Sequence, residues 1–448
     1  MPGDRGRALL PLVFCRECGQ EYYLVRRMAG DGEPGSLVVP RDLTDLSGDA
    51  AAQPGFLYRN TAHPWPDDEA GLIERLPEDW LEQAGQVRRI RRDRKPRLPQ
   101  ALHLDPLGRI TEGGLEWRFV PAPFPFCLNC GVAYGMRQRS DIGKLASLDA
   151  GGRSTATTVL SLACIRALGR DETVQAHARK LLSFTDNRQD ASLQAGHFND
   201  FVEVGLLRAA VCRAVQDAGE EGLTHDQLPQ RVFAALDMPF ELYASQPDVR
   251  FLARTETERA LREVLAYRLY QDLRRGWRIS APNLEQCDLL RVEYASLRDL
   301  CHAEEVWHER HAALAGATAQ ERERAARVLL GYLRRGLAIK VDSLRADYQE
   351  RLRQNSSQRL REPWAIDENE PMVTAAIAFP RSSRDHDFGG NLYVSGRGVF
   401  GQYLRRAGTL AGITGRISSE ETEAIIRDLF AALSLAGLVE RVIEAQGE

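Results

Sequence analysis

The stretch KLLSFTDNRQDASLQAGHFNDF, residues 180–201, decides our expectation for the fold of this 448-residue chain. Its first six residues predict a short buried strand, and its second half predicts a helix. The polar turn between them can cap the helix, and the free amides of a helix start can hold a phosphate group. The candidate residues for contact with a phosphate group of DNA are Thr185, Asp186, Asn187, Arg188 and Gln189. The alternative is an ordinary capped turn with its arginine in a salt bridge.

Composition sets the broad class of protein. Hydrophobic residues make up 43% of the chain and charged residues 27%, as expected for a folded protein of two to four domains. No apolar run reaches the roughly 18 residues of a membrane span, so we expect a cytoplasmic protein without a membrane partner. The net charge of −4 gives no overall signal for nucleic acid, although a local basic patch would be enough for binding.

Four of the eight cysteines form two similar pairs, FCRECGQEYY and FCLNCGVAYG. Each pair has the pattern C-x-x-C-G, with an aromatic residue before it and a tyrosine four residues after the second cysteine. Two such turns can place four thiolates around one Zn²⁺, and four protein ligands make that zinc structural. The expected ligands are Cys15, Cys18, Cys127 and Cys130. Two unrelated thiol pairs or redox motifs are the alternative, and the other four cysteines are expected to be small buried apolar residues.

The densest basic run of the chain, QVRRIRRDRKPR at residues 86–97, lies between the two cysteine pairs. Such a run can neutralise DNA phosphates, but it can equally be a solvated loop or a clamp on an acidic protein surface. The candidate DNA contacts in it are Arg88, Arg89, Arg91, Arg92 and Arg94.

The rest of the chain divides by its periodicity. Amphipathic helices dominate residues 189–307, and the charge runs at 319–354 indicate solvated helix faces. Near the C-terminus a short helix containing Arg405 and Arg406 precedes a helix that begins with a capping box at Ser418 or Ser419 and ends at Gly437. LVERVIE then predicts a strand. Helix, helix and strand at this length predict a winged helix, in which Arg405 and Arg406 would contact DNA, or would simply be surface arginines.

The motif at 180–201 resembles motif IV of superfamily 2 DNA helicases, the strand and turn that open the second RecA-like domain. It is most similar to that of very large bacterial DEAD/DEAH-box helicases, which carry a four-cysteine module just upstream. RRGWRISAPNLEQCDLLRVEY (274–294) and SGRGVFGQYLRRA (395–407) also resemble that family, less specifically. The resemblance implies an α/β fold with a mainly α-helical part: a β-rich zinc module at 1–150, the start of the second RecA-like domain at 151–204, a helical insertion at 205–362 and a winged-helix-like domain at 363–448.

Several parts of a helicase motor are missing from the sequence. There is no G-x-x-x-x-G-K-[ST] phosphate cradle, and Gly143-Lys144 lacks the required upstream glycine. There is no D-E-A-D or D-E-A-H box. Since phosphoryl transfer needs the cradle and its metal ligands, we expect no catalytic residues and no ATP hydrolysis by this chain alone. We interpret the chain as an internal segment of a helicase or as one product of a split gene.

Two hypotheses follow, and a third is weak. The chain is either a DNA-binding helicase segment or a zinc and winged-helix adaptor without a motor. In the first case it guides single-stranded or forked DNA in repair or phage defence. ATP and Mg²⁺ then enter only through another polypeptide that carries the first RecA-like domain. A metal-dependent hydrolase is weak because the nine histidines form no H-E-x-x-H cluster.

Overall fold

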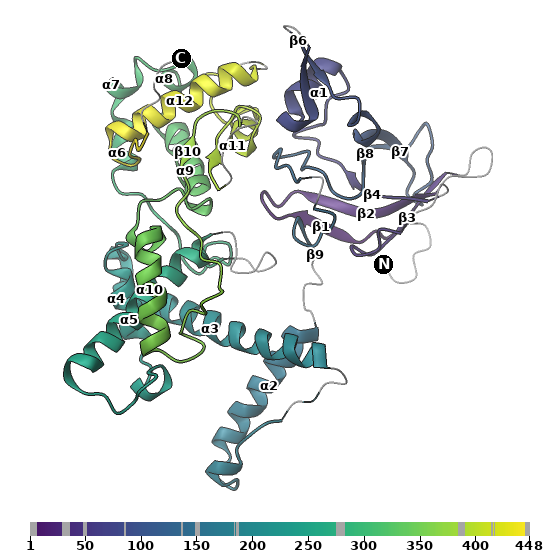
Figure 1. Cartoon of the computed structure of the whole chain (residues 1–448). Coiled ribbons are helices and arrows are strands. Elements are labelled where there is room, and N and C mark those ends of the chain that lie inside the picture. The colour runs from purple at the N-terminus through teal and green to yellow at the C-terminus, as the bar shows by residue number, and fades with distance from the viewer. Residues whose placement is uncertain are drawn as a thin grey trace. The chain divides into compact units, whose positions relative to one another are not determined.

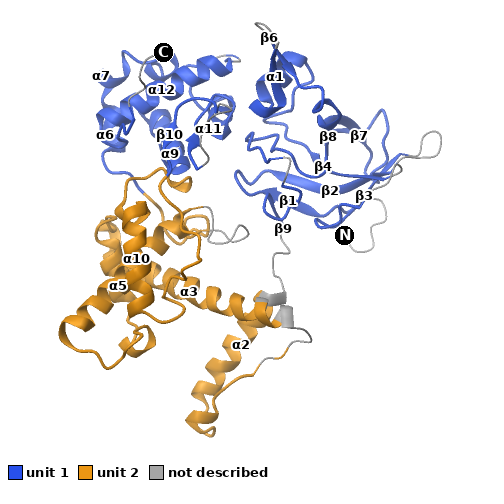
Figure 2. Cartoon of the chain, viewed as in Figure 1, with its two compact units in different colours: residues 1–148, 293–333, 376–448 blue, residues 149–292, 334–375 orange. Residues whose placement is uncertain are grey.

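The computed structural model divides the chain into two compact units (Figure 2). Unit 1 comprises residues 1–148, 293–333 and 376–448, and unit 2 comprises residues 149–292 and 334–375. The structure describes residues 7–28, 36–47, 52–84, 87–135, 138–147, 153–182, 184, 188–274, 283–383, 390–413, 415 and 417–443. The expected helical insertion is therefore split, because its residues 293–333 cluster with the cysteine-bearing segment and the C-terminal segment.

The first part of unit 1 is a seven-stranded antiparallel sheet. Six of its strands lie in the order β7-β8-β4-β2-β1-β9, and β3 pairs with the later part of β2, after the residues that pair with β1. Figure 1 shows β1, β2 and β4 side by side. The strands are β1 (Leu12–Cys15), β2 (Glu21–Met28), β3 (Leu37–Pro40), β4 (Ala52–Tyr58), β7 (Gln100–Leu104), β8 (Leu115–Pro121) and β9 (Leu145–Ser147). A separate hairpin joins β5 (Leu81–Ala84) to β6 (Val87–Ile90).

Alternation along β2 explains why this sheet has a core on each face. Tyr22 and Leu24 belong to the cluster that contains the cysteines, whereas Tyr23 and Val25 pack on the opposite face. Successive side chains of a strand point to opposite faces, so one strand supplies both clusters. At Gly55 in β4 a Cβ atom would lie 2.4 Å from the Phe119 ring, so this close crossing requires glycine.

The remaining part of unit 1 is mainly helical. Its helix α12 begins as the capping box predicts, because the Ser418 side chain accepts a hydrogen bond from the Glu421 amide at 3.1 Å. It ends before Gly437, which has a φ of +69°. The elements of unit 1 outside the sheet and hairpin are α1 (Glu69–Arg75), α6 (Leu297–His302), α7 (Glu304–Trp307), α8 (Ala312–Ala315), most of α9 (Ala319–Arg335), α11 (Val399–Leu404), α12 (Ser419–Leu435) and the parallel pair β10 (Ala378–Phe379) and β11 (Leu392–Tyr393).

Unit 2 is helical, with one large apolar cluster among its helices. Leu207 of α3, Leu261 and Val264 of α5 and Leu352 of α10 lie in that cluster and are essentially inaccessible to solvent. The helices of this unit are α2 (Arg153–Arg170), α3 (Arg188–Ala218), α4 (Leu228–Leu236), α5 (Phe251–Leu273) and α10 (Ala346–Arg359). No helix in the described ranges combines the length and apolar character needed to cross a bilayer.

The strand expected over residues 180–185 is not formed in its described part. Residues 180–182 and 184 have no regular secondary structure, and Leu182 and Phe184 are 79% and 86% exposed. A strand satisfies its backbone groups through a neighbouring strand, and no described strand pairs with this segment. The helix expected after the turn does form, as α3.

The strand expected in LVERVIE is not formed either. Residues 438–443 follow α12 without regular structure, and Val442 and Ile443 are 60% and 51% exposed. The wing of a winged helix is therefore not present in these residues. The sequence pattern was suitable for a strand, but no second strand lies beside it in the described part of the chain to complete a hairpin.

Candidate metal centre and nucleic-acid interface

The two C-x-x-C-G turns have the same local structure. Cys15 ends β1, and its carbonyl accepts a hydrogen bond from the Gly19 amide at 2.8 Å. In the second turn the Cys127 carbonyl accepts from the Gly131 amide at 2.9 Å. Gly19 and Gly131 have φ values of +71° and +73°, a conformation that glycine adopts without steric cost. The repeated glycine of the sequence pattern is therefore required by the turn.

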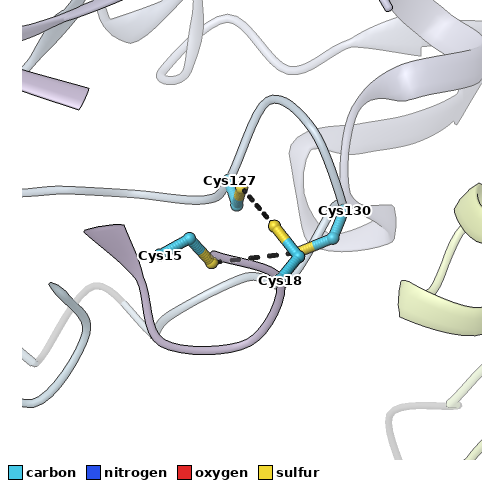
Figure 3. A group of neighbouring side chains, drawn as sticks. All are labelled: Cys15, Cys18, Cys127 and Cys130. Carbon is cyan, nitrogen blue, oxygen red and sulfur yellow. Dashed lines mark hydrogen bonds between the residues drawn. The ribbon is translucent and has the colours of Figure 1, made fainter. Parts of the chain in front are cut away.

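The four cysteine sulfurs lie within 4.8 Å of one another (Figure 3). Cys15 Sγ and Cys130 Sγ are 3.9 Å apart, and Cys18 Sγ and Cys127 Sγ are 3.7 Å apart. A tetrahedral centre with metal–sulfur bonds of about 2.3 Å would have sulfur–sulfur edges of about 3.8 Å. The residues present therefore fit a metal ion bound by four thiolates, as the spacing predicted.

Polar groups next to the sulfurs support a thiolate centre. The Tyr22 hydroxyl donates to Cys127 Sγ at 3.3 Å and accepts from the Leu128 amide at 2.7 Å. The Asn129 side-chain amide donates to Cys18 Sγ at 3.4 Å. The repeated tyrosine of the two cysteine motifs was the sequence signal for Tyr22, but its contact with the opposite cysteine pair depends on the fold.

The clustered thiols titrate together. Hydrogen bonds from Cys127 and then Cys130 lower the pKa of Cys18, which favours the thiolate form of this sulfur. Interaction with Cys127 raises the pKa of Cys15 and of Cys130. Burial also raises the pKa of Tyr22, so its hydroxyl stays protonated and donates to the sulfur.

The basic run forms β6 and the turn after it. Arg88 pairs with Glu78 at 3.0 Å, Arg91 with Asp93 at 3.3 Å, and Arg94 with Asp79 at 3.8 Å. Three further cations, Arg89, Arg92 and Lys95, are exposed and make no ion pair with a described residue. The run therefore contains both structural arginines and accessible cations.

Arg405 and Arg406 follow α11, where the side chain of Arg405 is 9% exposed and pairs with Glu74 at 2.9 Å. Arg406 donates to the Asn129 carbonyl at 3.4 Å. Nearby, Arg397 is buried and pairs with Glu74 and Glu78, each at 3.2 Å. Sequence reasoning did not identify Glu74, since an acid in a short helix carries no signal for partners more than 300 residues away.

The turn at 185–187 lies outside the described residues, and so do the side chains of Arg188 and Gln189 at the start of α3. Farther along α3, His197 packs against α2. Its ring nitrogens lie 3.2 Å from the Thr155 hydroxyl and 2.9 Å from the Thr158 hydroxyl. His197 therefore joins α3 to α2.

Lys144 cannot serve as the lysine of a phosphate cradle. Its side chain is 1% exposed, and its ammonium group bonds to Asp141 and to the Phe124 carbonyl, each at 2.9 Å. Lys144 is thus part of the interior of unit 1 and has no access to a bound phosphate group.

Of the other four cysteines, one is buried as expected and three are not. Cys301 is buried, Cys212 is intermediate, and Cys164 and Cys287 are exposed. The sequence placed them in helical segments, but the buried face of a helix is chosen by what packs against it.

Comparison with protein-family models, curated proteins and solved structures found no match to this chain.

Proposed function

We propose that this chain is the DNA-binding segment of an ATP-dependent superfamily 2 DNA helicase of the DEAD/DEAH-box type. A structural zinc ion stabilises its N-terminal module, and exposed cations hold single-stranded or forked DNA. The observation that carries the DNA part of the proposal is an exposed trio of cations: Arg89 in β6, and Arg92 and Lys95 in the segment that follows β6. Cations without acidic partners lose little when they neutralise a phosphate and release its counterions.

The helicase part of the proposal rests on the resemblance of residues 180–201 to motif IV. In this proposal the segment becomes a strand when it pairs within a second RecA-like domain, and the exposure of Leu182 and Phe184 fits an unpaired strand. The C-terminal helices then belong to a winged-helix-like domain whose wing is not formed by residues 438–443. A partner polypeptide supplies ATP turnover, and the process is DNA repair or defence against phage.

The zinc part of the proposal rests on the sulfur geometry. Four thiolates at tetrahedral spacing favour Zn²⁺ over harder cations, which prefer oxygen ligands. Metal analysis of the purified protein should find one zinc per chain, and Cys127→Ser should reduce that content. A protein that folds without metal, or that holds iron, would contradict this assignment.

DNA binding is tested by fluorescence anisotropy with labelled single-stranded and forked oligonucleotides over a salt series, with ATPase measured in the same samples. The triple variant Arg89→Ala, Arg92→Ala, Lys95→Ala should weaken binding and lower the log–log salt slope by about 2 for single strands, because each contact contributes about 0.7. The control removes three exposed arginines of the same unit elsewhere: Arg7→Ala, Arg109→Ala and Arg139→Ala.

Equal losses of DNA affinity in the two triple variants would show that binding does not depend on the hairpin cations in particular. Absence of binding by the parent protein at low salt would reject the DNA proposal. ATP turnover by the chain alone would contradict the absence of a phosphate cradle. The second candidate function is a zinc and winged-helix adaptor without a motor, and an adjacent reading frame that encodes the cradle would argue against it.

A further inference from the structure

A group of arginines surrounds the second cysteine turn. Arg75, the last residue of α1, donates to the Leu128 carbonyl and, at 3.3 Å, to the Pro64 carbonyl. Arg406 donates to the next carbonyl along the turn, that of Asn129. Because these two acceptors are neighbouring peptide groups, the two guanidinium groups lie close together although they are 331 positions apart in the sequence.

The nearby carboxylates are already used by other arginines. Glu74 accepts from Arg405 at 2.9 Å and from Arg397 at 3.2 Å. Glu78 pairs with Arg88 at 3.0 Å and with Arg397 at 3.2 Å. Two carboxylates are therefore shared among three arginines before Arg75 and Arg406 are counted.

Arg75 and Arg406 have carbonyl partners but no carboxylate partner among the described residues. Both are partly exposed, whereas Arg405 beside them is largely buried. The Nε–H groups of Arg405 and Arg406 also lack an acceptor in the described part of the chain. The cluster therefore has an excess of positive charge, and two of its buried N–H donors have no acceptor among the described residues.

The pKa of the His63 ring is affected by the charges of the same arginines. Its pKa is lowered to about 4, first by burial and then by the charges of Arg75, Arg406 and Arg405. Burial lowers the pKa of Arg75 and Arg405 as well, and repulsion between the arginines adds to this effect. An anion held here would relieve that repulsion, and a guanidinium group suits phosphate because it offers several donors in one plane.

We propose that Arg75 and Arg406, with Arg405 behind them, form a phosphate-binding site beside the four-cysteine centre. The site takes a phosphodiester group of a bound nucleic acid strand. This inference deepens the proposed function, since it adds a second contact to the same ligand, away from the hairpin cations. A phosphate group can also come from free inorganic phosphate, so the test has an arm for each source.

A competing role for these arginines is to balance the negative charge of a metal ion with four thiolates. Such a role would keep the arginines close to the turn but would require no external ligand. The two roles differ in what the loss of one charge changes: the affinity for phosphate in the first case, and the affinity for the metal in the second.

The test uses Arg406→Gln in the full chain, because glutamine can still donate to the Asn129 carbonyl but carries no charge. Arg139→Gln is the control, since Arg139 is exposed in the same unit and has no role in the cluster. Inorganic phosphate binding is measured by isothermal titration calorimetry, and binding of a labelled oligo(dT) by anisotropy over a salt series. Thermal unfolding and zinc content show whether each variant is folded and loaded.

We expect Arg406→Gln to weaken phosphate binding at least several-fold and to lower the oligo(dT) salt slope by about 0.7, the share of one phosphate contact. Arg139→Gln should change neither value. Unchanged phosphate and DNA binding in a folded Arg406→Gln protein would overturn the inference, and a fall in metal affinity alone would assign these arginines to charge balance.

The two proposals fail in different ways. Loss of DNA binding in the hairpin triple variant, with none in Arg406→Gln, would keep the proposed function and overturn this site. Phosphate binding that depends on Arg406 in a protein that binds no DNA would overturn the nucleic-acid ligand and the DNA-binding function together, and would leave a site for free phosphate.

Discussion

Replacing Tyr22 by phenylalanine removes one hydroxyl group from beside the four cysteines and leaves the ring in place. That hydroxyl donates to Cys127 Sγ at 3.3 Å and accepts from the Leu128 amide at 2.7 Å. Tyr22 and Leu128 are both fully buried, so water cannot replace the lost partner. A buried amide without an acceptor costs about 1–3 kcal/mol.

The same change removes a donor from a metal-binding sulfur. Loss of an outer partner of a metal ligand typically lowers metal affinity by about 10- to 100-fold, which corresponds to about 1.4–2.8 kcal/mol. We therefore expect Tyr22→Phe to bind zinc about 10- to 100-fold more weakly and to be less stable by a similar free energy. Zinc affinity is measured by competition with a chromophoric chelator, and stability by denaturant unfolding.

Tyr23→Phe is the matched control. Tyr23 is the next residue of β2, points to the other face of the sheet and contacts the Trp117 ring edge-on at 5.4 Å between centroids. Its substitution should leave zinc affinity unchanged. Equal zinc affinities for the two variants and the parent protein would refute the argument that the Tyr22 hydroxyl supports the centre.

Three further predictions concern burial and backbone conformation. Gly131→Ala should destabilise the protein by about 1 kcal/mol or more beyond Gly19→Ala in thermal unfolding. Both glycines have a positive φ, but of the two only Gly131 would bring a Cβ against a side chain, at 2.7 Å. Equal losses of stability in the two variants would contradict this reasoning. Lys144→Met should destabilise by about 3–5 kcal/mol because it leaves the Asp141 carboxylate buried and unpaired, and adding Asp141→Asn should recover part of the loss in denaturant unfolding. Burial raises the pKa of Glu203 to about 7. The free energy of unfolding should therefore fall by up to about 3 kcal/mol as the pH rises from about 4.5 to 7. Glu203→Gln should remove this dependence on pH, as measured by denaturant unfolding at several pH values.

The prediction that the two cysteine pairs come together is confirmed, and much of the information behind it is local. A C-x-x-C-G turn needs a left-handed glycine, and each turn closes through a hydrogen bond between residues four apart. The helix that starts at Ser418 was predictable for the same reason, since its cap lies within one turn. The helical segments followed from their periodicity, the α/β class was what the resemblance implied, and the structure is mixed α/β.

The strands expected at 180–185 and in LVERVIE did not form in their described residues because a strand depends on a neighbour. Apolar residues in a row state only that a segment can be buried in a sheet. Whether it is buried depends on a partner strand, and the periodicity of one segment contains no information about that partner. Leu182 and Phe184 are consequently exposed.

By itself, the sequence determined the four candidate metal ligands, the glycines that their turns require, the helical character of residues 205–362 and the lack of a phosphate cradle. Each of these depends on residues a few positions apart. Only the tertiary structure decided that Tyr22 supports Cys127, that Glu74 holds Arg405, and that Arg75 and Arg406 meet at the second cysteine turn. These contacts join residues 53 to 331 positions apart in the sequence, where folding, and no local pattern, selects the partner.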